Sequence, residues 1–339
     1  MKCAFVDQPG APETLQVGTM PDPTPGPGQV LVKIHVSSVN PIDTYVRAGA
    51  IPMPVDFPYI PGCDLAGTVV AVGPDAMRFR VGDRVWGSNQ GLFKRQGTLA
   101  ELAAVDEAWL YPIPSSMPDA DAAAGALTGI TVHLGLFKEA QLQPGEVVFV
   151  NGGTGGVGSL VVQFAKAVGA FVITTAGSEE KRSLAQKLGA DVALDYKSPT
   201  LDDDIKAAAA EHGGVSIYWE TQREPDLQRI IGLMRKGGRI VLMAGRQAEV
   251  KFNLGSFYTN DLKLIGFAMF NASPADQRKA AEDMNKWYTE GRWKPLIGAR
   301  FPLERAGDAH QLQEQATLQK SGKLTGKILV EVATPTEKA

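Results

Sequence analysis

The spacing of apolar residues divides the chain into two regions that predict different secondary structure. Up to about residue 120, short runs of β-type residues alternate with proline and glycine, and they predict strands at Lys2–Val6, Gln29–Val39, Gly67–Val72 and Arg84–Trp86. The stretch 21–28 holds four prolines and is expected to form a loop, because proline fixes φ and lacks a backbone donor. Short strands with frequent turns are typical of a β-barrel-type domain.

From Glu146 onward, strand-like and helix-like runs alternate. The expected strands are Glu146–Val150, Phe171–Thr175, Val192–Leu194, Val215–Tyr218, Arg239–Met243 and Leu262–Phe267. The expected helices are one that ends at Gly169-Ala170, Glu179–Leu188, Leu201–Glu211 and Pro225–Arg235, and a glycine after a helix fits a left-handed C-cap. Repeated strand–helix units require a parallel sheet that is covered on both faces. The predicted fold class is therefore α/β, with a doubly wound parallel-sheet domain in addition to the β-barrel-type domain.

The remaining residues change pattern again. Helices are expected at Pro274–Thr289 and near Leu303–Gln319, and a strand at Lys327–Val332 could return to the first domain. Ala333–Ala339 is mostly polar and is expected to fray. We therefore assign residues 1–122 to the first domain, residues 123–267 to the parallel-sheet domain, and residues 268–339 to a return to the first domain.

The most informative segment follows the first strand of the parallel-sheet domain and opens a helix. Its glycines fit the pattern Gly153-x-Gly155-x-x-Gly158, which is typical of a dinucleotide site. A tight turn, a close approach of the backbone to a pyrophosphate, and close packing of helix on strand each favour a residue without Cβ. The helix N-terminus adds N–H groups and a positive dipole end. The predicted phosphate loop is Gly153, Thr154, Gly155, Gly156, Val157 and Gly158.

The end of the next strand bears on the choice between NADPH and NADH. An NAD-preferring site places Asp or Glu there to bind the ribose 2′-hydroxyl, whereas this chain has Ala176-Gly177-Ser178. Lys181 and Arg182 follow within one helical turn, and either could meet a 2′-phosphate. NADPH is therefore the expected cofactor. Glu179 and Glu180 leave NADH open, since one of them could bend back to a 2′-hydroxyl.

Composition and charge narrow the classes of partner. A net charge of −3 gives no polybasic signal, so neither nucleic acid nor an anionic membrane is expected as a partner. No apolar run approaches the roughly 20 residues that span a bilayer, and the first residues lack the apolar core of a secretory signal. The chain has only two cysteines, Cys3 and Cys63, which excludes a disulfide framework and favours a reducing, cytoplasmic compartment.

Several short blocks keep a characteristic order and spacing along the chain. They are Val39–Gly49, Pro58–Gly67, Val81–Val85, Gly97–Glu101, the phosphate loop, Gly237–Ile240 and Thr325–Lys327. This series resembles the medium-chain dehydrogenase/reductase superfamily, and most closely its zinc-free quinone oxidoreductase branch, the zeta-crystallin-like enzymes. The resemblance covers nearly the whole chain. It implies a GroES-like catalytic domain split around an inserted Rossmann domain, with the active site in the cleft between them, and a homodimer or homotetramer.

The resemblance also implies site residues. Cofactor contacts beyond the phosphate loop fall on Tyr45, Gly177, Lys181, Tyr196, Met243, Ala244, Gly245, Arg246, Phe267, Ala268 and Met269. We add Ser178, which either lines this site or caps the helix that follows it. Asn40, Asp43 and Tyr45 match positions that line the substrate end. Leu99 departs from the branch, which usually has an aromatic residue there, and Trp219–Glu224 lacks the usual Asn near the cofactor.

A metal centre is not expected. Zinc alcohol dehydrogenases of the same superfamily need Cys or His ligands in the first domain, but this chain has Asn40 and Gly62-Cys63-Asp64 at those positions. The stretch 88–97, where a four-cysteine lobe would lie, contains no cysteine. Without a metal to stabilise an alkoxide, the sequence favours acceptors with conjugated, easily reduced systems.

Three functions compete at this point. In an NADPH-dependent quinone oxidoreductase, Asn40 and Tyr45 could donate hydrogen bonds to the acceptor oxygen, although Asp43 could simply cap the helix after Pro41 and Asn40 could hold a loop. An enone or alkenal double-bond reductase would have the same phosphate loop. A structural, crystallin-like or RNA-binding protein is the third, and the absence of a basic patch counts against it.

Overall fold

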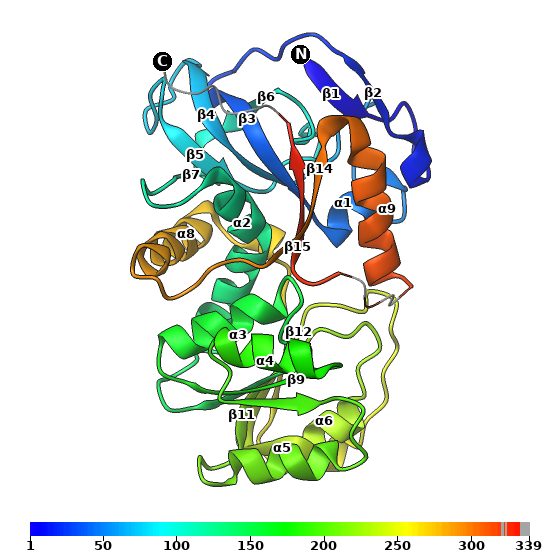
Figure 1. The fold of residues 1–339 in the computed structure, drawn as a ribbon, viewed down its shortest axis with the longest axis vertical. Helices are drawn as coiled ribbons and strands as arrows, with labels where there is room; N and C mark the ends of the chain where they lie inside the picture. Colours follow the sequence, from blue (N-terminus) through cyan, green and yellow to red (C-terminus); the bar gives the residue numbers. More distant parts are fainter. Residues whose placement is uncertain (320–321, 323, 333–339) are drawn as a thin grey trace. The chain divides into compact units, whose positions relative to one another are not determined.

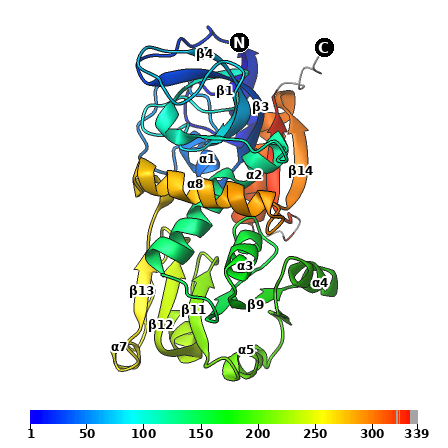
Figure 2. The ribbon, with the colours of Figure 1, turned by 90° about the vertical axis from the view of Figure 1, so that its left-hand side faces the viewer.

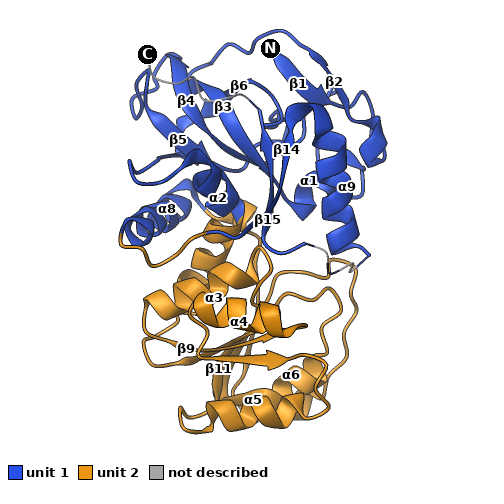
Figure 3. Ribbon diagram, viewed as in Figure 1, with its two compact units in different colours: residues 1–127, 273–289, 295–339 blue, residues 128–272, 290–294 orange. Residues whose placement is uncertain are grey.

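The structure, a computed structural model, describes residues 1–319, 322 and 324–332, so the predicted fraying of 333–339 lies outside the described residues. The chain forms two compact units (Figure 3). Unit 1 comprises residues 1–127, 273–289 and 295–339, and unit 2 comprises residues 128–272 and 290–294. The main boundaries follow residues 127 and 272, where the sequence analysis has 122 and 267, and the short return at 290–294 is a feature that it does not contain.

Unit 2 is built on a six-stranded parallel sheet. The strand order is β10-β9-β8-β11-β12-β13, so the chain starts in the middle of the sheet and winds outward in both directions. The strands are β8 (Val147–Val150), β9 (Phe171–Ala176), β10 (Val192–Asp195), β11 (Val215–Glu220), β12 (Met234–Leu242) and β13 (Lys263–Gly266). The predicted doubly wound parallel sheet is confirmed. Figure 2 shows β11, β12 and β13 side by side, and β13 forms one edge of the sheet.

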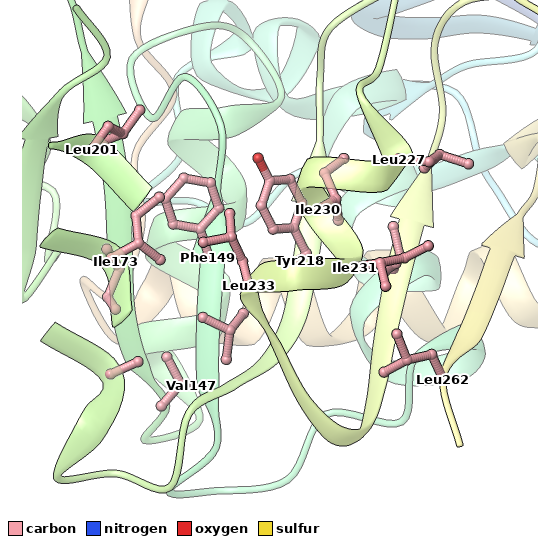
Figure 4. Close-up of a cluster of buried hydrophobic side chains, with 14 residues drawn as sticks. Val147, Phe149, Ile173, Leu201, Tyr218, Leu227, Ile230, Ile231, Leu233 and Leu262 are labelled. Carbon is pink, nitrogen blue, oxygen red and sulfur yellow. The ribbon is translucent and has the colours of Figure 1, made fainter. Parts of the chain in front are cut away.

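Helices cover both faces of this sheet (Figure 1). They are α3 (Gly158–Ala167) and α4 (Glu179–Lys187) on one face, α5 (Leu201–Ala210) and α6 (Leu227–Leu233) on the other, and the short α7 (Leu254–Tyr258) before β13. Under α5 and α6, side chains from strands and helices interdigitate, as Phe149, Tyr218 and Ile230 show in Figure 4. Gly169 and Gly189 follow α3 and α4 with φ of 85° and 110°, as the C-cap prediction requires.

Unit 1 contains a curved seven-stranded sheet and a small hairpin. The sheet has the order β14-β15-β3-β4-β5-β7, with β6 also paired to β3. Its strands are β3 (Gln29–Val39), β4 (Asp64–Val72), β5 (Arg84–Gly87), β6 (Leu102–Asp106), β7 (Leu110–Pro112), β14 (Ile297–Pro302) and β15 (Lys327–Glu331). The hairpin pairs β1 (Lys2–Phe5) with β2 (Gln16–Thr19). Alternate residues of β3 point into a buried core with β4, for example Val32 and Ile34 against Leu65 and Val69.

The chain returns to unit 1 near its end, as predicted. β15 lies between β14 and β3, and it pairs antiparallel with β3 so that Ile328 faces Val39. Unit 1 also contains α1 (Pro41–Arg47), α8 (Pro274–Thr289) and α9 (Ala306–Thr317), together with short 3-10 helices at Pro12–Thr14, Glu107–Trp109 and Leu303–Arg305. A second buried cluster joins α9 to β15 and β1, and it includes Ala306, Ala309 and Ile328.

One long apolar helix was not among the helices expected from the sequence. α2 (Asp119–His133) continues into a π-helical stretch, Leu134–Glu139. Together they form 21 residues, and their most apolar 18-residue window has a mean hydropathy of 1.3, which meets the length and composition of a membrane span. However, 83% of its most apolar window is buried inside the protein, and burial in a core accounts for the same composition.

Candidate functional site

The phosphate loop joins β8 to α3, and its three motif glycines have different surroundings. A Cβ at Gly153 would collide with the Thr174 side chain, and a Cβ at Gly158 would collide with the carbonyl oxygen of Gly152. A Cβ at Gly155, by contrast, would meet only that carbonyl oxygen, 3.7 Å away. Packing therefore requires the first and third glycines, whereas the second leaves open space beside the backbone. This is the arrangement that lets a pyrophosphate approach the middle of the loop.

The loop is held in place by the neighbouring strand. The backbone N–H of Gly152 donates to Thr175 Oγ1 and that of Gly153 donates to the Thr175 carbonyl, both at 3.1 Å. The Thr174 hydroxyl donates to the carbonyl oxygen of Val150 at 2.8 Å. These bonds fix the loop before any ligand arrives, so binding does not have to order it.

The middle of the sheet, where the winding direction changes, contains a buried carboxylate. Asn151 follows β8 and Glu220 ends β11, and the Asn151 amide donates to both Glu220 carboxylate oxygens at 3.1 and 3.3 Å. The Thr221 hydroxyl donates to the Asn151 carbonyl at 2.6 Å. Glu220 is 3% exposed, and burial raises the pKa of its carboxyl. Ligands of doubly wound sheets bind at this position, and the sequence analysis assigns Glu220 no role.

Gly177 and Tyr196 form one wall at the carboxyl ends of β9 and β10. A Cβ at Gly177 would lie within 3.0 Å of the Tyr196 ring, so the two residues pack directly. Tyr196 is 53% exposed and offers a ring face, with the Lys197 ammonium 5.7 Å from its centroid. Ser178 caps α4, since its hydroxyl accepts a hydrogen bond from the Lys181 N–H at 3.3 Å. The capping alternative for Ser178 is therefore the one that the geometry supports.

The charges that follow Ser178 are partly paired with one another. Arg182 forms ion pairs with Glu179 at 2.6 Å and with Asp195 at 3.1 Å. Glu179 is thus turned toward Arg182, and the charge of Arg182 is compensated by two carboxylates. In the same turn, Lys181 is partly exposed and Glu180 is exposed.

The other predicted cofactor residues lie beyond β12 and β13, at the same edge of the parallel sheet. Met243–Arg246 follow β12, and Gly245 has a φ of 83° and packs against the Arg223 backbone. Phe267–Met269 follow β13. Phe267 packs edge-on against Trp219 with ring centroids 6.4 Å apart, and Met269 is 3% exposed and accepts from the Thr131 hydroxyl. At least Met269 therefore has a packing role.

In unit 1, Asn40 is fully buried, and both the nitrogen and the oxygen of its side-chain amide form hydrogen bonds. Its Nδ2 donates to Asp64 Oδ2 at 2.8 Å, and its Oδ1 accepts from the Lys327 ammonium. Lys327 also donates to the Val39 carbonyl at 3.0 Å. Ser38 completes the network with a 2.7 Å bond to Asp64. Asn40 therefore links β3, β4 and β15. This geometry supports the alternative in which Asn40 holds a loop, and not the one in which it donates to the acceptor oxygen.

Burial shifts the ionisation of this network. It raises the pKa of the Asp64 carboxyl and lowers that of the Lys327 ammonium, while each group's charge favours the charged form of the other. Burial also raises the pKa of Cys63 well above its usual value. The sequence analysis notes Lys327 only within a block of the resemblance, and no local signal connects it to Asn40.

Asp43 and Tyr45 lie on the same short helix, α1, but in different surroundings. Asp43 is 1% exposed, and its Oδ2 accepts from the backbone N–H of Asn40 at 2.7 Å, which caps the helix. Burial raises the pKa of Asp43 to about 7. Tyr45 is partly exposed. Of the three residues predicted at the substrate end, Tyr45 alone presents a side chain that is not enclosed by unit 1.

The side chains near Asn40 do not fit a zinc ion. Zinc takes thiolate, imidazole or carboxylate ligands, whereas here the Cys63 thiol is held protonated by burial and the Lys327 ammonium binds Asn40 directly. A dication would repel that ammonium. Within residues 1–319, 322 and 324–332, no group of three His, Cys, Asp or Glu side chains is arranged to hold a metal.

Two family models match parts of this chain. Residues 26–115 match the family model described as alcohol dehydrogenase GroES-like domain, and residues 156–286 match the model described as zinc-binding dehydrogenase. A quinone oxidoreductase of Rattus norvegicus is 32% identical over 331 residues, covering 97% of this chain and 98% of the relative.

Two solved structures are similar over almost the full chain. An NAD-dependent alcohol dehydrogenase is 28% identical with a TM-score of 0.88, covering 98% of this chain and all of the other. A mycobacterial protein solved in complex with NADPH is 26% identical with a TM-score of 0.83, covering 98% of this chain and 100% of the other.

Proposed function

Because the chain belongs to the quinone oxidoreductase branch of the medium-chain dehydrogenase/reductase superfamily, we propose that it is an NADPH-dependent, zinc-independent quinone reductase. One observation carries this proposal. The phosphate loop has its second glycine open to a ligand, in a chain that is 32% identical to a quinone oxidoreductase over nearly its whole length.

The residues of unit 2 fit a dinucleotide. Gly155 and the first turn of α3 would hold the pyrophosphate, Gly177 and Tyr196 would flank the adenosine half, and Asn151 with Thr221 would line the crevice at the centre of the sheet. When bound, NADPH supplies a hydride. The protein's own contribution is to hold the cofactor in a loop that is already ordered.

NADPH is proposed over NADH because of the charges after β9. No carboxylate ends this strand, and Glu179, which could have reached a 2′-hydroxyl, is engaged by Arg182 at 2.6 Å. Arg182 is itself compensated by Glu179 and Asp195. Lys181, which is partly exposed in the same turn, is the cation proposed to contact the 2′-phosphate. Glu180 is exposed, and it is the carboxylate that still favours NADH.

Tyr45 is proposed as the hydrogen-bond donor to the acceptor oxygen. Asn40 and Asp43 are enclosed by unit 1, so we assign them the positioning of α1 rather than contact with the acceptor. Reduction of a quinone by two electrons requires one hydride and one proton. The hydride comes from NADPH and the proton from water or from the Tyr45 hydroxyl.

The proposed assembly is a homodimer or homotetramer. β13 forms an edge of the parallel sheet, and Leu264 on it is 41% exposed, close in sequence to the exposed Leu254 and Tyr258 of α7. An unpaired edge with apolar side chains favours pairing with a second copy. Light scattering of Leu264→Lys against the unchanged chain tests this assignment, with a shift toward monomer expected.

The function is tested by following NADPH oxidation against a panel of quinones and enones. We expect turnover with 1,4-benzoquinone and 1,4-naphthoquinone, little turnover with 2-cyclohexenone, and lower kcat/KM with NADH. Turnover of enones alone would favour the double-bond reductase instead. No turnover with any acceptor, in protein that still binds NADPH, would argue against both reductase functions and favour the non-enzymatic one.

A further inference from the structure

Unit 1 contains a cavity to which no function has been assigned above. Its volume is about 490 Å³, which falls in the range of small-molecule sites. It is bounded by β5, β7, the loop before β5, and α8, all within unit 1. Three of its lining residues carry the argument, namely Arg78, Tyr111 and Arg278. Figure 1 shows α8 alongside β5 and β7.

Two residues that line this cavity carry buried donor groups that have no hydrogen-bond partner among the described residues. Tyr111 is 1% exposed, and its hydroxyl has no hydrogen-bond partner. The Nε–H of Arg278 is also buried and unpartnered. A buried donor that makes no hydrogen bond costs about 1–3 kcal/mol, so such groups are uncommon in folded proteins without a bound acceptor.

The cavity also brings together two arginines, Arg78 and Arg278, that form no ion pair with a carboxylate of the described residues, although the charges of Glu107 and Asp106 favour the charged form of Arg78. Arg78 donates to the carbonyls of Glu107 and Leu110, which are neutral acceptors. Burial lowers the pKa of the Arg78 guanidinium, and the like charge of Arg278 lowers it further. Throughout residues 1–319, 322 and 324–332, neither arginine has a carboxylate within 4.0 Å.

The carboxylates near the cavity are occupied elsewhere or exposed. Glu107 accepts from the backbone N–H groups of Met77 and Arg78, and Asp83 accepts from that of Arg80. Asp119 forms an ion pair with Arg84, a third arginine that lines the cavity. Glu282 lines the cavity too, but its side chain is exposed on α8.

We propose that this cavity is a second ligand site, which binds a small organic oxyanion. A carboxylate or phosphate group would accept hydrogen bonds from the Tyr111 hydroxyl and the Arg278 guanidinium, with Arg78 adding a second positive charge. Phe79, Ile113 and Ala281 supply an apolar wall. The occupant therefore carries its anionic group on an apolar or aromatic body. The site lies wholly within unit 1 and uses no residue of the phosphate loop.

The test is calorimetric titration of the full chain with phenyl phosphate and with benzoate. These two probes distinguish a phosphate ester from a carboxylate, and benzyl alcohol is the neutral control of similar shape. We expect either anion to bind and benzyl alcohol not to. Arg278→Gln should weaken the anion about tenfold or more, and Tyr111→Phe about fivefold, which are the ranges for one charged and one neutral hydrogen bond.

Two controls separate this site from other causes. Lys286→Gln removes an exposed charge from the same helix and should leave the affinity unchanged. Tyr111→Phe removes an unpartnered hydroxyl, so without ligand its melting temperature should equal or exceed that of the unchanged chain, while the increase caused by ligand should shrink. Equal affinity in Arg278→Gln and the unchanged chain would overturn the proposal, as would binding that Gly158→Ala abolishes and Arg278→Gln does not.

Discussion

Replacing Asp43 by asparagine removes one titratable group from the buried network of unit 1 and keeps the shape of the side chain. Asp43 Oδ2 accepts from the Asn40 N–H at 2.7 Å, and the amide oxygen of an asparagine accepts the same bond. The other carboxylate oxygen is buried, and the Cys63 thiol also interacts with the Asp43 carboxyl. The cap of α1 is therefore retained, and the variant differs mainly in how its free energy of unfolding depends on pH.

The sign and size of that difference follow from the pKa of Asp43. Burial raises this pKa from 3.8 to about 7, so between these values the folded chain holds a proton that the unfolded chain releases. The stabilisation from this proton is complete below pH 4 and is lost as the pH rises through about 7. At about 1.4 kcal/mol per pH unit, the loss amounts to about 4 kcal/mol. The asparagine amide does not titrate in this range, so the variant lacks this loss.

Thiol labelling under urea measures the effect in unit 1 alone. Both cysteines of the chain, Cys3 and Cys63, are buried in unit 1, so their reaction with a small thiol reagent reports the unfolding of that unit. Between pH 4.5 and 8, Asp43→Asn should gain about 3 kcal/mol in free energy of unfolding relative to the unchanged chain. Asp56→Asn, at an exposed position of the same unit, should gain nothing. A pH profile of Asp43→Asn that parallels the unchanged chain would refute the argument from burial.

Four further outcomes are expected. Gly158→Ala forces a Cβ against the Gly152 carbonyl and should weaken NADPH binding at least tenfold by fluorescence titration, whereas Gly232→Ala, with no atom within 4 Å, should not. Lys181→Ala should weaken NADPH by about 1.5–3 kcal/mol and leave NADH nearly unchanged, and equal losses would remove Lys181 from the phosphate contact. Tyr45→Phe should change kcat/KM for a quinone only modestly, whereas a loss of about a hundredfold confined to an enone, with the unchanged chain preferring enones, would contradict quinone reduction as the main activity. Elemental analysis should find no stoichiometric zinc, and one tightly held zinc whose removal abolishes activity would end that assignment.

Local sequence patterns were sufficient to predict those elements that are determined by a few neighbouring residues. β3 has the predicted bounds, Gln29–Val39, because its long β-type run between turns is itself the signature of a strand. The phosphate loop follows from rules of backbone space that act within Gly153–Gly158. β14 (Ile297–Pro302) was not predicted, because no residue of it is fully buried and its pairing depends on β15, about 30 residues further along.

Long-range contacts account for the parts of the site that the sequence did not reveal. Lys327 and Asn40 are 287 positions apart, and only the sheet order brings the ammonium to the amide. Likewise, Glu220 meets Asn151 because β11 and β8 are neighbours in the sheet. The family resemblance identified Asn40 and Asp43 as residues of the substrate end, but a match of positions could not tell a residue that contacts a ligand from one that holds the fold together.

The position of β15 also sets an order of events during synthesis of the chain. Residues 128–272, which form nearly all of unit 2, are contiguous, so they leave the ribosome as one stretch able to fold while translation continues. Unit 1 cannot complete its sheet until β15 (Lys327–Glu331) has been synthesised, because β15 lies between β3 and β14. Until then Val36–Val39 of β3 lack a strand on the side away from β4, and Asp64 and Asp43 lack the ammonium of Lys327. Nascent chains that stall between residues 272 and 327 should therefore be the species that needs chaperone protection.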